Sequence, residues 1–266
     1  MYDIIIVGGG PAGLSAAITA RMRGKSAVII SNDRSDSGFY KAREINNYPG
    51  LHGLSGAELS DRFVSHALEM GAEMIDGRVT AVLPAGGEIY VSYGSETQTA
   101  KALILATGVA QASVFPGETE FLGRGVSYCA TCDGMLYRGK KVCVVMHAPD
   151  AAQEAGHLVS IGVDVTRLET KNISVVGDDK VTSVVADGEE IPCDGVFILR
   201  PTIAPGSLVP GLETLDGRIR VDPSMATNIP GVFAAGDCAG APRQVAKAVG
   251  EGQIAVLAAI AYIDKK

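Results

Sequence analysis

The chain has 266 residues, of which 47% are hydrophobic and 20% are charged, as is ordinary for a soluble globular protein. Its formal net charge of −7 argues against a sequence-independent nucleic-acid binder, because such binding depends on neutralising phosphates with basic residues. The apolar run at residues 254–263 is too short to span a bilayer, and five cysteines are too few for a disulfide scaffold.

A strand is expected at residues 2–7, directly at the start of the chain and without a preceding basic segment or cleavage site. We therefore expect a cytoplasmic protein that binds neither a membrane nor nucleic acid. Later strands are predicted by short β-branched runs at residues 27–30, 79–83, 89–93, 102–106, 142–145, 163–168, 174–176, 181–185, 196–199 and 232–235. Helices are predicted at residues 13–23, 56–70 and 244–263, with another small-residue helix following residue 150.

This alternation predicts an α/β fold with two dinucleotide-binding-type, Rossmann-like domains. Pro116 and Gly117 break the pattern after the strand at 102–106, and a loop rich in Pro and Gly occupies residues 201–217. We expect the chain to cross between domains at these two places. The first domain would be discontinuous, with residues 1–112 and 215–266, and the second would be a shorter domain of residues 113–214.

A glycine-rich turn follows the first predicted strand in IIIVGGGPAGLSAA. Gly8, Gly10 and Gly13 form the pattern G-x-G-x-x-G, and Pro11 and Ala12 lie inside it. In this context Gly8 makes the tight turn, Gly10 lets backbone N–H groups approach a pyrophosphate, and Gly13 allows close helix packing. The start of the helix adds a favourable environment for the anion. The turn therefore predicts a dinucleotide site.

The ribose partner at this site is left open. An acidic residue is usual at the end of the second strand of such a unit. Here the sequence at that place is Ser31-Asn32-Asp33, and any of the three side chains could accept a hydrogen bond from the ribose.

Two later turns favour a flavin over a nicotinamide at the first site. Thr107 and Gly108 follow one buried strand, and Gly236 and Asp237 follow another. With these motifs the chain resembles the flavoprotein disulfide reductases that have two dinucleotide domains. The resemblance implies that both turns close on FAD and that Asp237 bonds the ribityl and phosphate part.

A cysteine pair lies in GRGVSYCATCDG, with Cys129 and Cys132 separated by two residues. Such a pair is either a redox disulfide or half of a zinc site, and a structural zinc needs two more ligands. No such ligand spacing is found among Cys143, Cys193, Cys238, His52, His66, His147 and His157, which are isolated in the sequence. We therefore predict a redox dithiol and no metal, with Asp133 able to hold or deliver the proton that thiolate chemistry requires.

The position of CATCDG, before a second strand–helix unit, resembles the low-molecular-weight thioredoxin reductases. Asn47-Tyr48-Pro49-Gly50 and Arg243-Gln244 fit the same pattern. The resemblance implies a homodimer in which Asn47, Arg243, Gln244 and Val245 lie beside the FAD. It also implies that Cys132 faces the flavin and forms the transient C4a adduct, that Cys129 attacks the disulfide of thioredoxin, and that Asp133 is the acid/base.

The second nucleotide turn departs from that family. Its glycines are replaced in Met146-His147-Ala148-Pro149-Asp150, and the arginine run that grips the 2′-phosphate is replaced by residues 165–171, VTRLETK. Asp150 and Glu169 would repel a phosphate, although Arg167 and Lys171 could substitute for the missing arginines. The pattern resembles the ferredoxin-dependent flavin thioredoxin reductases, which keep FAD and the cysteine pair without NADPH recognition.

The resemblance implies ferredoxin as the electron donor and thioredoxin as the acceptor. Basic residues that could meet an acidic ferredoxin flank the cysteine region: Arg124, Arg138, Lys140 and Lys141. Three other functions stay open at this point: an NADPH-dependent thioredoxin reductase, a flavin dithiol oxidase that uses oxygen, and a flavin-binding regulatory protein without turnover.

Overall fold

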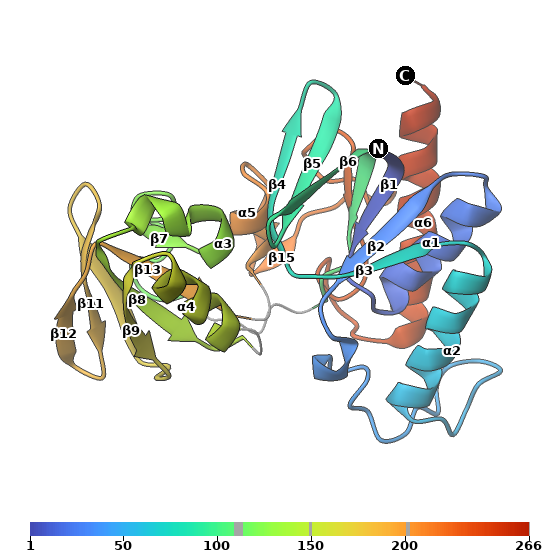
Figure 1. Cartoon of the computed structure of the whole chain (residues 1–266). Coiled ribbons are helices and arrows are strands. Elements are labelled where there is room, and N and C mark those ends of the chain that lie inside the picture. The colour runs from blue at the N-terminus through green and yellow to red at the C-terminus, as the bar shows by residue number, and fades with distance from the viewer. Residues whose placement is uncertain (109–113, 149–150, 201–202, 266) are drawn as a thin grey trace. The chain divides into compact units, whose positions relative to one another are not determined.

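The computed structural model describes residues 1–108, 114–148, 151–200 and 203–265, without the side chains of Asp36, Thr131 and Cys132 (Figure 1). The chain divides into two compact units. Unit 1 consists of Met1–Ala110 and Leu208–Lys266, and unit 2 of Gln111–Ser207. Our expected domain ends at residues 112 and 214 lie two and seven residues beyond these divisions.

A seven-stranded sheet forms the centre of unit 1, in the order β3-β2-β1-β6-β5-β4, with β16 also paired to β6. The strands β3, β2, β1, β6 and β16 run parallel, whereas β4, β5 and β6 form an antiparallel meander. The bounds are β1 (Tyr2–Val7), β2 (Ala27–Ser31), β3 (Glu73–Asp76), β4 (Val79–Ala85), β5 (Glu88–Tyr93), β6 (Glu96–Leu105) and β16 (Val232–Ala234). A small hairpin of β14 (Thr214–Leu215) and β15 (Arg218–Ile219) lies outside this sheet.

Strand β6 joins the two parts of this sheet because its two halves pair differently. Its polar first half pairs with β5, from Glu96 opposite Tyr93 to Ala100 opposite Ile89. Its apolar last three residues, Leu103 to Leu105, are fully buried and pair with β16. The sequence predicted only this apolar half, because ETQTAK lacks the hydrophobic alternation of a buried strand.

Two helices of unit 1 lie against each other over the parallel strands, α1 (Pro11–Met22) and α6 (Val245–Asp264) (Figure 1). Small residues allow the close approach: a Cβ at Gly252 would lie 2.1 Å from the carbonyl oxygen of Ala12. Helix α2 (Gly56–Glu69) starts with a capping box between Ser55 and Glu58. A short 3-10 helix, η1, occupies Arg34–Asp36.

Helix α6 is longer than the apolar run that the sequence analysis considered. Among the described residues, this 20-residue helix is the one long and apolar enough to cross a membrane by length and composition. Its buried residues are Ala248, Gly252, Ala255, Val256, Ala259 and Ile263. They face the hydrophobic core that α1 and the sheet also form, whereas Ile254 and Leu257 of the same helix are 44% and 38% exposed.

Unit 2 combines a parallel sheet of order β7-β13-β8-β9 with an antiparallel sheet of order β10-β11-β12. The parallel strands are β7 (Val126–Ser127), β8 (Lys141–Met146), β9 (Asp164–Leu168) and β13 (Gly195–Leu199). The antiparallel strands are β10 (Ile173–Gly177), β11 (Val181–Ala186) and β12 (Glu189–Pro192). The helical segments are α3 (Ala130–Asp133), η2 (Gly134–Tyr137), α4 (Ala151–Ser160) and α5 (Pro205–Leu208).

The two parallel sheets with their covering helices confirm the predicted α/β class and the two dinucleotide-binding-type units. The helix predicted after residue 150 is α4, and its buried residues Ala151, Ala155 and Leu158 pack on Val142 and Val144 of β8. Strands β3, β7 and β12 and helix α3 were not predicted from the sequence. They are two to four residues long, too short to produce a recognisable period. Pro149, Asp150 and the start of the loop at 201–217 lie outside the described residues.

Candidate active site

The glycine turn of unit 1 is held by close backbone contacts at two of its three glycines. Gly8 has a φ of +111°, and a Cβ there would lie 2.3 Å from the carbonyl oxygen of Ala106. A Cβ at Gly13 would lie 2.0 Å from the carbonyl oxygen of Gly8. At Gly10, by contrast, a Cβ would meet nothing within 4 Å. Gly8 and Gly13 therefore shape the turn, and Gly10 borders open space where a pyrophosphate can approach the backbone.

The turn after β6 also has features that fit a bound ligand. The hydroxyl of Thr107 is buried beside the Cys238 thiol, a weak hydrogen-bonding group, and has no closer partner within the described part of the chain. A bound group at this turn could offer the hydroxyl a stronger hydrogen bond. Gly108, with a φ of +69°, faces open space. These features fit a dinucleotide at the carboxyl edge of the parallel sheet.

The turn after β16 lies at the same edge, because β16 runs parallel to β6. Burial raises the pKa of the half-buried Asp237, against the lowering effect of Lys247 and Arg243. Lys247 Nζ donates to the carbonyl oxygens of Gly236 at 2.9 Å and Gly240 at 2.6 Å, which fixes this turn. The Asp237 carboxylate is thus available to accept from ligand hydroxyls near the glycine turn.

Three further predicted residues lie at the start of α6. The amide of Asn47 donates to the side-chain oxygen of Gln244, which is 197 positions later in the sequence. Gln244 is the N-cap of α6, and Arg243 and Val245 are its neighbours. The structure therefore brings Asn47 and residues 243–245 together.

Two of the three candidate ribose partners, Ser31 and Asp33, have side-chain hydrogen bonds within the protein. Ser31 Oγ accepts the Gly9 N–H at 3.0 Å and donates to the Asn32 carbonyl oxygen at 3.1 Å. Asp33 caps η1 by accepting the Ser35 N–H at 2.9 Å, and this hydrogen bonding holds its pKa below the ordinary value. Ser31 contacts the glycine turn directly, whereas the Asp33 side chain hydrogen-bonds within its own loop.

In unit 2, the first redox cysteine lies at the carboxyl end of β7. Cys129 is disulfide-bonded and only 5% exposed, and the side chain of Cys132 lies outside the described part of the structure. Ser127 Oγ donates to Asp133 Oδ2 at 2.6 Å and accepts the Cys129 N–H at 3.1 Å. Ser127 therefore links the predicted acid/base to the backbone of the predicted nucleophile. The sequence analysis missed it, although it stands two residues before Cys129.

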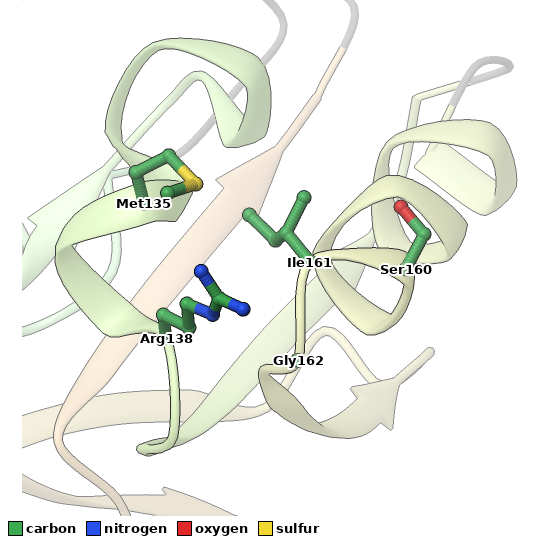
Figure 2. Close-up of a pocket in the computed structure, with 5 residues that line it drawn as sticks. All are labelled: Met135, Arg138, Ser160, Ile161 and Gly162. Carbon is green, nitrogen blue, oxygen red and sulfur yellow. The ribbon is translucent and has the colours of Figure 1, made fainter.

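The segment after the cysteines presents apolar side chains beside a pocket (Figure 2). Met135 is 60% and Leu136 is 68% exposed. The pocket, of about 390 Å³, is lined by Met135, Arg138, Ser160, Ile161 and Gly162. Figure 2 shows Met135 of η2 and Arg138, which directly follows η2, on one side of the pocket and Ile161, which follows α4, on the other.

The carboxyl edge of the unit 2 sheet carries a connected buried cluster. Glu118 is 2% exposed, and its Oε1 accepts the Tyr128 hydroxyl at 2.9 Å. Its Oε2 accepts Arg200 Nη2 at 2.7 Å and the Phe115 N–H at 2.9 Å. The Arg200 guanidinium lies 4.7 Å from the centre of the Phe115 ring, and the His147 ring centre lies 6.2 Å from that of Phe115.

His147 completes this cluster on the β9 side. Its Nε2 lies 3.0 Å from the Thr170 carbonyl oxygen, and because a carbonyl only accepts, Nε2 is the protonated nitrogen. Tyr128, Arg200, His147 and Thr170 follow the carboxyl ends of β7, β13, β8 and β9, which is the order of the strands in the sheet. We name Phe115, Glu118, Tyr128, His147 and Arg200 the edge cluster.

Two of the remaining cysteines, Cys143 and Cys193, are isolated in the sequence but lie together in the structure. Their hydrogen bond and their burial raise the pKa of Cys143. Burial raises the pKa of Cys238, whose thiol donates to the Leu105 carbonyl oxygen at 3.3 Å. Within the described residues, no three His, Cys, Asp or Glu side chains are grouped as a metal site.

A dinucleotide cradle in one unit and a disulfide-bonded cysteine in the other define a flavoprotein disulfide oxidoreductase. Comparison with known proteins agrees with this class. The family model of the pyridine nucleotide-disulphide oxidoreductases matches residues 2–173 and 150–252, and the chain belongs to this family. Its cofactor is FAD, which supplies a centre able to accept and release both one and two electrons.

Individual relatives indicate which members of this family the chain resembles. A thioredoxin reductase of Listeria innocua serovar 6a is 34% identical over 303 residues, covering 100% of this chain and 95% of the relative. Two structures of a ferredoxin-flavin thioredoxin reductase from Clostridium acetobutylicum are 40% and 39% identical, with TM-scores of 0.86 and 0.89. The two alignments cover 99% and 100% of this chain, and 98% and 99% of the Clostridium chains. The chain is therefore a thioredoxin reductase-like flavoprotein.

The contrast between two glycines tests the cofactor cradle. Gly13→Ala places a methyl group against the Gly8 carbonyl, so we expect it to destabilise the protein by about 1–3 kcal/mol. Gly10→Ala places its methyl group in open space and should leave the thermal stability of the FAD-free protein unchanged. It should weaken FAD binding about ten- to hundredfold, because it obstructs hydrogen bonds to a charged phosphate. Calorimetry and flavin fluorescence titration measure the two effects. FAD affinity of Gly10→Ala equal to that of the parent would contradict the assignment.

Proposed function

We propose that this enzyme is an FAD-dependent thioredoxin reductase that receives its electrons from ferredoxin instead of NADPH. In this proposal Cys129 and Cys132 carry two electrons to the disulfide of thioredoxin, and Asp133, oriented by Ser127, is the acid/base. FAD is held by the glycine turn, Asn47, Thr107, Gly108, Gly236, Asp237 and residues 243–245. Unit 1 is thus the FAD-binding domain and unit 2 the redox-disulfide domain.

The edge cluster is the observation that carries the choice of donor. In open α/β sheets, nucleotides bind in the crevice at the carboxyl ends of the strands. In unit 2 the same edge is occupied by protein side chains that follow β7, β13 and β8, and by the Thr170 carbonyl after β9. The Arg200–Glu118 ion pair within it is 4% and 2% exposed. A pyridine nucleotide would have to displace a buried, paired carboxylate, which costs several kcal/mol.

The altered turn after β8 also argues against a pyridine nucleotide in unit 2. Ala148 is buried and places a methyl group where a glycine would bring the backbone close to a phosphate. Arg167 is exposed on β9, whereas the sheet edge ahead of it is occupied by the His147 ring. The relative from Listeria aligns over 303 residues with the 266 residues of this chain, so this chain lacks part of that protein.

Ferredoxin as donor is supported by the name of the relatives from Clostridium acetobutylicum and by charge. Arg138, Lys140 and Lys141 are exposed in one stretch that follows the cysteine region, where they could attract an acidic protein. Arg124 is less available, because its guanidinium donates to the Asp179 and Glu120 carbonyl oxygens. We further propose a cytoplasmic homodimer, as in the family pattern.

Thioredoxin as acceptor is supported by the names of the relatives and by the apolar surface beside the cysteines. Met135 and Leu136 follow the cysteine segment directly and are more than half exposed. Exposed large apolar side chains next to a reactive group are typical of a protein-binding surface. A disulfide on thioredoxin would receive two electrons and two protons, while the enzyme dithiol closes to its disulfide.

Anaerobic reduction of the flavin tests the donor. We expect reduced ferredoxin to bleach the flavin absorbance of the oxidised enzyme in stoichiometric amounts and to sustain thioredoxin reduction. NADPH at the same concentration should bleach it at least about a hundredfold more slowly, because it finds no crevice in unit 2.

Two outcomes would contradict this proposal. Rapid stoichiometric bleaching by NADPH would identify an ordinary NADPH-dependent thioredoxin reductase. Rapid oxygen consumption with dithiols, together with no thioredoxin reduction from either donor, would favour a dithiol oxidase.

A matched pair of leucine variants tests the acceptor surface. Leu136→Asp should raise the KM for thioredoxin about tenfold, because a charge replaces an apolar contact at the interface. Reduction of a small aromatic disulfide should stay at the parent rate. Leu215→Asp is the control, since Leu215 is equally exposed, at 67%, but lies in unit 1. An unchanged KM in Leu136→Asp would show that thioredoxin docks elsewhere.

A further inference from the structure

The short helix that begins at the redox cysteines is built on α4, the helix that follows the altered nucleotide turn. Ala130, the residue after Cys129, is fully buried in one cluster with Ala151, Ala155 and Leu158 of α4. Four residues later, a Cβ at Gly134 would come within 2.8 Å of Leu158 Cδ2. The CATCDG segment therefore lies along α4, with its glycine against the Leu158 side chain.

Glu154 is the acidic residue of α4 that reaches this segment. It lies three residues after Ala151 and four before Leu158, so it shares their side of the helix. Its Oε2 accepts the Ala130 N–H at 2.8 Å. That amide belongs to the peptide bond between Cys129 and Ala130. The half-buried carboxylate is thus anchored one peptide unit from the first redox cysteine.

A negative charge at this place acts on the thiolate of Cys129. Like charges disfavour each other's ionised form, and they do so more strongly where little water is present. Cys129 is only 5% exposed. Because thiolate formation stabilises the reduced dithiol, a charge that opposes the thiolate makes the dithiol give up its electrons more readily.

We propose that Glu154 is a positioning residue that fixes the Cys129–Ala130 peptide and makes the enzyme dithiol a stronger reductant. The inference rests on the proposed function only in taking Cys129 as a redox cysteine. It assigns a role to the second nucleotide-type unit: its helix carries the carboxylate that tunes the dithiol. In the reaction concerned, the enzyme disulfide takes up two electrons and two protons, its S–S bond breaks, and two S–H bonds form.

The variant Glu154→Gln separates charge from shape. Its amide oxygen can still accept the Ala130 N–H, but the charge is gone. The FAD-loaded enzyme is equilibrated anaerobically with dithiothreitol, which closes to its cyclic disulfide as it donates two electrons and two protons. Free enzyme thiols are then counted by alkylation and mass spectrometry. We expect the equilibrium constant to move toward the dithiol by about three- to tenfold, where tenfold equals about 30 mV for two electrons.

A second readout is the pH dependence of Cys129 alkylation, which should shift to lower pH in Glu154→Gln. The other titratable groups near Cys129 in the described structure are Asp133, held by Ser127, and Tyr128, held by Glu118, and the variant leaves both in place. Glu154→Leu, which also loses the hydrogen bond, should in addition lower the melting temperature. Glu189→Gln on β12 is the control for net charge, since Glu189 is exposed.

The proposal is overturned if Glu154→Gln has the dithiol equilibrium and alkylation profile of the parent enzyme. It is also overturned if Glu189→Gln shifts both to the same extent, because the effect would then be one of overall charge. These measurements use neither ferredoxin, NADPH nor thioredoxin. Their result is therefore independent of which donor or acceptor the enzyme uses.

Discussion

The carboxylate of Glu118 organises the carboxyl edge of the unit 2 sheet. It receives a guanidinium, a phenolic hydroxyl and a backbone N–H in a place that water hardly reaches. A buried charge of this kind is tolerated only when it is paired and fully hydrogen-bonded, and removing one partner typically costs about 3–5 kcal/mol. Dinucleotide-binding sheets hold their ligand at this edge. In unit 2 the edge is occupied by an internal structural contact.

The contacts of Glu118 favour a structural role for unit 2 in holding the redox cysteine segment. Its strands and helix α4 keep the arrangement of a dinucleotide-binding unit, and both of its buried contacts reach the redox cysteine segment. Tyr128, the residue before Cys129, donates to Glu118, and Gly134 lies against Leu158. In unit 1 the corresponding edge stays open at Gly10. One fold thus serves as a cofactor cradle in one unit and as a dithiol scaffold in the other.

The shape of the unit 1 glycine turn can be read from the sequence because the constraint on it is local. Gly8 and Gly13 face carbonyl oxygens at distances that only glycine permits. The two glycines in the sequence therefore indicate the close backbone contacts of the turn. The edge cluster could not be predicted, because Glu118 and Arg200 are 82 positions apart and only the sheet order brings them together. The missing glycines at residues 146–150 predicted from the sequence that nucleotide recognition is lost, and this stays a proposal. They did not indicate that His147 and Phe115 lie together at the strand ends.

The central claim is that the strand ends of unit 2 have no room for a pyridine nucleotide. Calorimetric titration of the oxidised, FAD-loaded enzyme with NADPH and with 2′,5′-ADP tests it most directly, because it measures binding without electron transfer. The account predicts no saturable binding of either compound at millimolar concentration. Stoichiometric binding with a micromolar dissociation constant would show that the edge cluster opens to admit a nucleotide, and would contradict the account.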